Sequence, residues 1–353
     1  MVEQIINSHI GGNLAKLLFI GTARYSINIC DFDLIYHNSK HEIVGCLLHE
    51  SIKTKHWFKT AKYAGTSRDA IVTDLKQLPR EFWSSYKELK LLIDCYDFDY
   101  ICIGNGNDEV GLALQKDIKT NFLFSEYGWF PWNQCFFISK GGVGYKSDIA
   151  KMTSIDKQPD HSDDIESFKN SLNIGTSFNG SKFILVTLQN DNICSDGKPD
   201  FKYRFSQFKN NKEFLNHVRK ITPKEYTILV KNHPNNKKPT TIPIGMIDIS
   251  KFNLNKFELY SNMSAMMVIN STSVLEACLF DRPVITFGKC IFSNKNITEE
   301  DISSQEQVSE IISKNIDLDR RKRFANLLFE RQINRSKCSK QEYINDHCWV
   351  NCI

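Results

Sequence analysis

The sequence KNHP at residues 231–234 follows an apolar run, residues 226–230, that predicts a buried β-strand. The sequence NSTSVLEA at residues 270–277 follows a second such run, residues 265–269. Both polar stretches therefore begin where a strand ends. In an open parallel α/β sheet, ligands bind in the crevice outside the carboxyl ends of the strands. We therefore expect these two stretches to line one binding site.

The first stretch has the chemistry of an anion site. Lys231 carries a positive charge, and the imidazole of His233 can carry one. Pro234 disfavours helical geometry at His233 and so holds it extended. Phosphate is the anion that we expect here, although a single histidine is more often structural than functional.

The second stretch opens a predicted helix. Ser271, Thr272 and Ser273 stand where a helix N-terminus presents unpaired N–H groups and the positive end of its dipole, which together bind anions. An ordinary alternative stays open, because Ser273 and Glu276 have the spacing of a capping box. Glu276 could also reach the hydroxyl groups of a bound ribose.

Composition narrows the class of protein. A chain of 353 residues suits two domains, and 41% hydrophobic with 24% charged residues is typical of a globular protein. A net charge of +4 does not indicate nucleic acid binding. No apolar run reaches the roughly 20 residues of a membrane span, and the N-terminus lacks the pattern of a signal peptide, so we expect a cytoplasmic protein. Several of the 11 cysteines lie in apolar runs, which indicates buried thiols rather than disulfides or zinc ligands.

Predicted strands and helices alternate along the chain, which favours largely parallel sheets in an α/β fold. A polar, turn-rich segment at residues 153–181 predicts a linker. We therefore predict an N-terminal Rossmann-like domain (residues 1–165), a C-terminal Rossmann-like domain (175–316) and a helical tail (317–353). The strands expected are 17–20, 43–48, 70–72, 100–103, 121–124, 183–187, 226–230, 247–249, 265–269 and 283–286, with helices at 79–93 and 212–221.

Two sets of carboxylates are candidates for catalysis. Glu126 follows the strand 121–124 among aromatic residues, where lost hydration would raise its pKa and suit it to acid or base chemistry, unless it only receives backbone hydrogen bonds. Gln189 ends the strand 183–187, and the acids that follow it could supply a nucleophile or simply be solvated. These acids are Asp191, Asp196 and Asp200.

Two other features are weaker. The pairs Asp31/Asp33 and Asp97/Asp99 match a pattern that holds divalent metals in many sugar-nucleotide enzymes, but the spacing is common by chance and we expect no metal site. The basic run at residues 320–323 could rest on an anionic membrane face, although a solvated helix surface is the ordinary interpretation.

Three pieces of the sequence, in order, resemble the bacterial capsule polysaccharide biosynthesis family, whose characterised members are retaining β-Kdo transferases that use CMP-Kdo. The first piece is FDYICIGNG at residues 98–106, and the second is FSEYGWFP at 124–131 with GGVG at 141–144. The third runs from the strand 183–187 through KNHP and NSTSVLEA to Arg282-Pro283-Val284. The resemblance covers about residues 97–288.

The resemblance implies a GT-B fold, with two αβα domains facing across a cleft, and a CMP-sugar donor with no further cofactor. It implies that Lys231, His233 and the hydroxyl groups of residues 271–273 hold the CMP phosphate. Glu126 matches the family's acid. The family's nucleophilic aspartate follows the L-Q strand end, where Asp191, Asp196 and Asp200 all remain open.

The partners implied are a CMP-sugar donor and a glycan or glycolipid acceptor in capsule or lipopolysaccharide synthesis, with peripheral contact to the inner membrane through the basic tail. Two alternatives are kept. One is a transferase for sialic acid or another nonulosonate. The other, from a different class, is a sugar-nucleotide isomerase or a non-catalytic glycan-binding protein.

Overall fold

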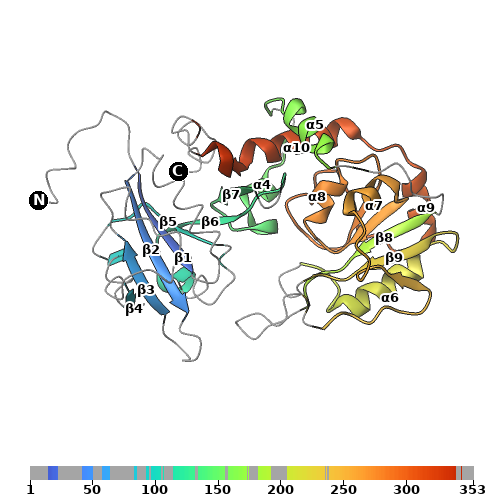
Figure 1. Cartoon of the computed structure of the whole chain (residues 1–353), viewed down its shortest axis with the longest axis horizontal. Coiled ribbons are helices and arrows are strands. Elements are labelled where there is room, and N and C mark those ends of the chain that lie inside the picture. The colour runs from blue at the N-terminus through green and yellow to red at the C-terminus, as the bar shows by residue number, and fades with distance from the viewer. Residues whose placement is uncertain are drawn as a thin grey trace, which may run out of the picture.

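The computed structural model describes residues 15–22, 42–50, 58–63, 83–85, 93–94, 97–104, 106, 114–131, 134–155, 158–172, 174, 182–191, 205–234, 236, 238–338 and 343. These residues form two α/β lobes, each built on one β-sheet (Figure 1). The predicted strand 70–72, Asp31, Asp33, Asp196 and Asp200 lie outside the described residues.

The sheet of the N-terminal lobe has the strand order β14-β7-β6-β5-β1-β2-β3-β4. Its strands are β1 (Lys16–Thr22), β2 (Glu42–Glu50), β3 (Phe58–Tyr63), β4 (Trp83–Ser85), β5 (Tyr100–Ile103), β6 (Asn121–Tyr127), β7 (Cys135–Ser139) and β14 (Ile333–Asn334). Strands β2, β1, β5 and β6 run parallel, and the pairs β2/β3, β3/β4, β6/β7 and β7/β14 are antiparallel. The prediction of a largely parallel sheet is therefore wrong for this lobe.

One predicted helix of this lobe is also wrong in part. The run 79–93 has aromatic and aliphatic residues at steps of three, yet residues 83–85 form strand β4, which pairs with β3. Tryptophan is favoured in strands, so pairing at the sheet edge overrides a weak helical pattern.

The sheet of the C-terminal lobe is parallel throughout, as predicted. Its order is β10-β9-β8-β11-β12-β13, from β8 (Phe183–Thr187), β9 (Thr227–Lys231), β10 (Met246–Asp248), β11 (Ala265–Val268), β12 (Val284–Thr286) and β13 (Glu299–Glu300). The helices are α6 (Asn211–Ile221), α7 (Lys256–Asn262), α8 (Ser273–Ala277), α9 (Gln305–Ser313) and α10 (Leu318–Arg331).

Alternating side chains of this sheet enter two separate cores. Leu185 and Met266 pack on one face with residues of α7, α8 and α10, while Val186 and Met267 pack on the other with residues of α6 and α9. Because a strand's side chains point alternately to the two faces, strands covered on both sides read as continuous apolar runs. This is why the strands of this lobe were predictable.

The two lobes share side-chain contacts. The Gln332 side chain accepts the backbone N–H groups of Trp129 (3.0 Å) and Phe130 (2.9 Å) and donates to the Phe130 carbonyl (2.8 Å). The buried ammonium of Lys295 donates to the carbonyls of Ala150 (3.2 Å) and Met152 (2.7 Å) at the end of α4 (Asp148–Lys151).

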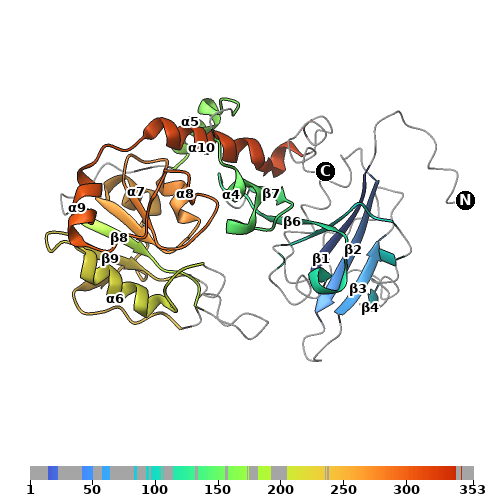
Figure 2. The same ribbon diagram turned by 180° about the vertical axis from the view of Figure 1, so that it is seen from behind.

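Figures 1 and 2 show α10 running along both lobes. Beside it, α5 (Ser162–Asn170) lies inside the predicted linker 153–181.

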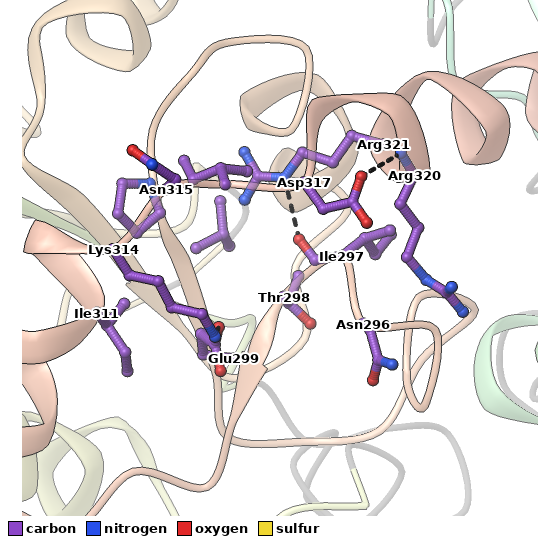
Figure 3. Close-up of a pocket in the computed structure, with 13 residues that line it drawn as sticks. Asn296, Ile297, Thr298, Glu299, Ile311, Lys314, Asn315, Asp317, Arg320 and Arg321 are labelled. Carbon is purple, nitrogen blue, oxygen red and sulfur yellow. Dashed lines mark hydrogen bonds and ion pairs between the residues drawn. The ribbon is translucent and has the colours of Figure 1, made fainter.

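The basic run of α10 serves mainly the fold. Arg321 is buried and donates to the carbonyls of Ile297 (3.1 Å), Phe280 (3.1 Å) and Arg282 (2.7 Å), while the side chain of Arg320 donates to the Lys295 carbonyl. Figure 3 shows this contact of Arg321 with Ile297 at the wall of a cavity on the amino-terminal side of β12. Of residues 320–323 only Lys322 is exposed, and the expected membrane contact through this run stays a prediction.

We expect Arg321→Ala to lower the free energy of unfolding by about 3 kcal/mol, because three carbonyls lose their donor and the buried site loses a large side chain. Urea denaturation followed by circular dichroism measures the change. Lys322→Ala, on the same helix and 52% exposed at its side chain, is the matched control and should change stability by less than about 0.5 kcal/mol. Equal effects of the two variants would contradict this account of Arg321.

Other predictions can be compared directly. Cys102, Cys135, Cys278, Cys290 and Cys338 are buried free thiols, and the first three of these lie in the apolar runs from which buried thiols were predicted. Within the part of the chain that the structure describes, no helix has both the length and the apolar character needed to cross a bilayer.

Candidate functional site

The two polar stretches lie side by side at the carboxyl edge of the C-terminal sheet. Strand β9 ends at Lys231 and β11 ends at Val268, and both flank β8. The hydroxyl of Thr187, at the end of β8, lies 3.1 Å from the hydroxyl of Ser273. The edge therefore brings the three strand ends together.

A cavity of about 290 Å³, here cavity A, opens at this edge. From the C-terminal lobe it is lined by the predicted residues Lys231, His233, Pro234, Ser271, Thr272, Ser273 and Glu276, and from the N-terminal lobe by Gly128 and Trp129. One cavity thus holds a lysine, a histidine and three hydroxyl groups. This combination suits an anionic ligand.

Asn232 fixes the geometry of the KNHP loop. Its backbone N–H donates to the Ser250 hydroxyl at 2.7 Å, and its side-chain oxygen accepts the backbone N–H of Thr240 at 2.9 Å. The side chain is buried and lines cavity A together with Lys231 and His233, so these hydrogen bonds hold the loop that presents all three residues to the cavity.

Helix α8 contributes less to anion binding than the sequence indicated. It has only five residues, Ser273–Ala277, and its N-cap Thr272 makes no side-chain capping bond. The first N–H groups are already used: Ser273 N–H donates to the Ser271 hydroxyl (3.3 Å) and Val274 N–H to the Ser271 carbonyl (3.1 Å). The expected row of unpaired N–H groups is therefore not found here. Charge on a ligand would have to be met by Lys231, His233 and the hydroxyls.

Gln189 shapes the loop of residues 270–273, which carries the hydroxyl groups of the site. Its side-chain amide lies 2.6 Å from the backbone nitrogen of Ser271 and 3.2 Å from that of Asn270, and its oxygen accepts both N–H groups when it faces them. Its own backbone is held by Asn211, which accepts the Gln189 N–H at 3.1 Å and donates to the carbonyl at 2.9 Å. Gln189 therefore positions the hydroxyl loop rather than presenting a free amide to a ligand.

Glu276 does not form the capping box that its spacing allowed. Instead, both of its carboxylate oxygens accept from the ammonium of Lys256 on α7, each at 2.7 Å. Burial raises the pKa of Glu276, and the charge of Lys256 opposes that rise. Burial also raises the pKa of the neighbouring phenol Tyr260, with the Glu276 charge adding to it. Cavity A is thus lined by a buried carboxyl group that is paired with one lysine.

The pKa of Glu276 gives a stability prediction. Between its ordinary value of 4.5 and the raised value, the folded chain binds more protons than the unfolded chain, so stability falls as pH rises through that window. Glu276→Gln does not lose stability in this way. The melting temperature of the variant minus that of the wild type should therefore rise from pH 4.5 upward and then level off. Lys256→Met removes the opposing charge and should extend the wild-type slope to higher pH. A melting-temperature difference that is flat across this range would contradict the assignment.

A second cavity of about 410 Å³, here cavity B, adjoins cavity A. Glu126, at the end of β6, lines it together with Tyr127, Trp129 and Phe137. One Glu126 oxygen accepts the N–H of Tyr127 at 3.0 Å, so the backbone hydrogen bond that the sequence left open is present as well. The two cavities share four residues: Trp129, His233, Ser271 and Thr272.

Of the acids proposed as nucleophile or metal ligands, the structure describes Asp97, Asp99 and Asp191, and none of these lines cavity A or cavity B. Asp191 is half-buried, with its backbone N–H donated to Asn236 at 2.7 Å, and it lines neither cavity A nor cavity B. Asp99 stands at the opposite, amino-terminal end of β5, where it accepts the backbone N–H of Lys16 at 2.7 Å. Among the described residues no group of three or more His, Cys, Asp or Glu side chains is placed to hold a metal.

The structure adds residues to the site that the sequence did not indicate. Lys256 and Tyr260 come from α7, and Tyr145, Phe205 and Lys289 line cavity B. Tyr145 directly follows the GGVG stretch and Lys289 follows the end of β12 by three residues, but neither stretch singles these side chains out. Lys256, Tyr260 and Phe205 reach the cavities through the packing of their helix or loop, which no local pattern marks.

Residues 174–315 match the family described as "Capsule polysaccharide biosynthesis protein". A comparison of the sequence with curated proteins finds no match. Among solved structures, the chain is similar to Thermosulfurimonas dismutans KpsC, beta Kdo 2,7 transferase, with a TM-score of 0.54 at 14% identity over 90% of this chain and 92% of that one.

Two further structures are more distant. The beta Kdo 2,4 transferase of the same KpsC gives a TM-score of 0.45 at 14% identity, over 65% of this chain and 79% of that chain. Methanocaldococcus jannaschii UDP-GlcNAc 2-epimerase gives 0.33 at 13% identity, over 89% of this chain and 99% of that chain. Neither value is high enough to carry an argument. Residues 174–315 therefore match a capsule polysaccharide biosynthesis family, and the chain has a two-lobed, GT-B-type fold similar to that of a β-Kdo transferase.

Proposed function

We propose that this protein is a glycosyltransferase that moves Kdo from CMP-Kdo to a glycan or glycolipid acceptor in capsule or lipopolysaccharide synthesis. The family match and the likeness in fold support this proposal. The observation that carries it is the junction of the two cavities. A cationic cavity with Lys231 meets a cavity with the carboxylate of Glu126, and His233 lies in both.

In this proposal, cavity A takes the CMP moiety. Transfer breaks the bond between the anomeric carbon and the phosphate oxygen, and CMP departs as a phosphate monoester. Lys231 and His233, with the hydroxyls of the 271–273 loop, would neutralise the charge that grows on the departing oxygen. Since these groups are already held by Asn232 and Gln189, little reorganisation is needed as the bond breaks.

Cavity B would take the acceptor. An aspartate, chosen among Asp191, Asp196 and Asp200, would attack the anomeric carbon and expel CMP, forming a covalent glycosyl-enzyme. Glu126 would then accept the proton of the acceptor hydroxyl as that oxygen displaces the aspartate. Two displacements at one carbon restore the original configuration, as in retaining glycosidases. Neither a metal nor a cofactor takes part in these steps, and turnover should be unchanged in EDTA.

Thermal stabilisation by nucleotides tests the donor assignment. A ligand that binds the folded state stabilises it by RT ln(1 + [L]/Kd), which is about 2.7 kcal/mol at a hundredfold excess over Kd. CMP and CMP-Kdo should raise the melting temperature, and UDP and UDP-GlcNAc should raise it less. CMP release that requires an acceptor would support transfer. Preferential stabilisation by UDP-GlcNAc, with interconversion of the sugar, would instead favour an isomerase.

A further inference from the structure

Two aromatic rings, one from each lobe, face each other in cavity B. Tyr145 belongs to the short helix η4 (Gly144–Lys146) of the N-terminal lobe, and Phe205 precedes α6 in the C-terminal lobe. Their ring centroids are 5.4 Å apart, with the planes tilted by 57°. Although they touch, Tyr145 is 37% exposed and Phe205 is 44% exposed. Much of their apolar surface therefore remains open to solvent within a cavity.

The backbone holds Phe205 in this open position. Its φ of 50° lies in the left-handed region, which costs a residue other than glycine about 1–3 kcal/mol and often marks ligand sites. The next residue, Ser206, fixes it, because Ser206 forms a β-bridge with Gly288 and donates its hydroxyl to the Phe287 carbonyl at 2.6 Å. A strained backbone at Phe205 that several neighbouring contacts hold in place indicates that its ring has a role other than core packing.

Tyr145 is held just as firmly. The preceding Gly144 has a φ of 57°, which places the tyrosine at a sharp turn. The carboxylate of Asp148 accepts the backbone N–H groups of Lys140 (2.8 Å) and Gly141 (3.1 Å), which closes the glycine loop in front of the turn. Both rings are thus fixed before any ligand arrives, and a rigid aromatic surface loses little entropy on binding.

The chemistry of the cavity points to a sugar. An aromatic face carries partial negative charge, and the C–H face of a pyranose ring presents weakly positive hydrogens of matching area. Polar groups are also present in cavity B to meet hydroxyls, among them the ammonium of Lys289, which Glu300 holds at 2.6 Å, and the carboxylate of Glu126. Apolar stacking with a few fixed polar groups is typical of small-molecule sites.

We propose that Tyr145 and Phe205 form a subsite that stacks a pyranose ring of the acceptor glycan. The inference rests on the proposed function, since it assigns cavity B to the acceptor side of the same transfer. It places the rings in the same cavity as the carboxylate of Glu126, which activates the acceptor hydroxyl. The subsite selects a sugar ring by its apolar face rather than by charge.

Saturation-transfer NMR with the methyl glycosides of Kdo, glucose, galactose and N-acetylglucosamine tests the subsite. At least one glycoside should receive saturation on its ring C–H protons. Tyr145→Ala and Phe205→Ala should each weaken that glycoside by about tenfold, the loss expected for one stacking contact. Tyr145→Phe keeps the ring and should bind as the wild type does. Phe252→Ala removes a 59% exposed phenylalanine outside both cavities and should have no effect.

Each outcome decides the proposal. No saturation transfer to any of the four glycosides, or transfer that survives both alanine variants, overturns it. If the alanine variants instead remove saturation from the cytosine protons of added CMP, the rings hold the base and the sugar assignment is wrong. Failure of the proposed function looks different, because the wild type would then bind a glycoside while CMP gave no thermal stabilisation.

Discussion

Glu126→Gln should lower the rate of transfer from CMP-Kdo to acceptor by about 10²–10⁴-fold, the contribution of a general base. The amide keeps the size of the carboxylate and its hydrogen bond from Tyr127, but it cannot accept the proton of the acceptor hydroxyl. Because Glu126 acts only after CMP has left, the variant should still cleave the donor once. Intact-protein mass spectrometry should therefore show the enzyme carrying one Kdo residue.

Two controls separate catalysis from folding in this variant. CMP should stabilise Glu126→Gln as much as it does the wild type, because Glu126 lines cavity B and not cavity A. Glu310→Gln, an exposed carboxylate of α9 outside both cavities, should keep full activity. Turnover of Glu126→Gln near the wild-type rate would remove the base from the mechanism. A strongly lowered rate with no trapped sugar would contradict the covalent route.

The strand ends of the C-terminal lobe were predictable for a physical reason. A strand buried on both faces is a continuous apolar run, so Lys231 and Asn270 mark its end directly in the sequence. Parallel strands of one sheet have their carboxyl ends at the same edge. Because KNHP and NSTSVLEA each follow such a strand, they were expected to lie at one edge. The same reasoning identified Glu126, which was expected to follow the strand 121–124 and lies near the end of β6, since that strand runs on to Tyr127.

The remaining features depend on contacts that no local pattern encodes. Residues 270–277 have the sequence of a capped helix, yet the N–H groups at its start are taken by Gln189 and Ser271, and Glu276 turns to Lys256. The antiparallel edges of the N-terminal sheet likewise come from strands β3, β4 and β14, which are short or distant in sequence from their partners. Tertiary pairing decides such elements.

The largest effect on donor use is expected from the KNHP loop. Lys231→Ala and His233→Ala should each lower kcat/KM for CMP-Kdo by about 10²-fold, and mainly through kcat, because charge on the leaving phosphate oxygen is greatest in the transition state. Both variants should also show a smaller thermal stabilisation by CMP. The buried Asn232 anchors the loop through its own hydrogen bonds to Ser250 and Thr240, so the fold should survive either change.

The control for the loop lies near the other end of the same strand. Lys224→Ala removes an exposed lysine just before the amino-terminal end of β9, so it changes net charge equally while leaving the carboxyl edge intact. It should keep wild-type kcat/KM and CMP stabilisation. Helix α8 is short and its first N–H groups are already hydrogen-bonded, so it cannot bind a phosphate alone. Glu276 already engages Lys256. Lys231 and His233 must therefore supply most of the remaining positive charge in cavity A. If CMP stabilised both alanine variants as strongly as the wild type, the phosphate would have to lie outside cavity A, and the transferase proposal would lose the geometry on which it rests.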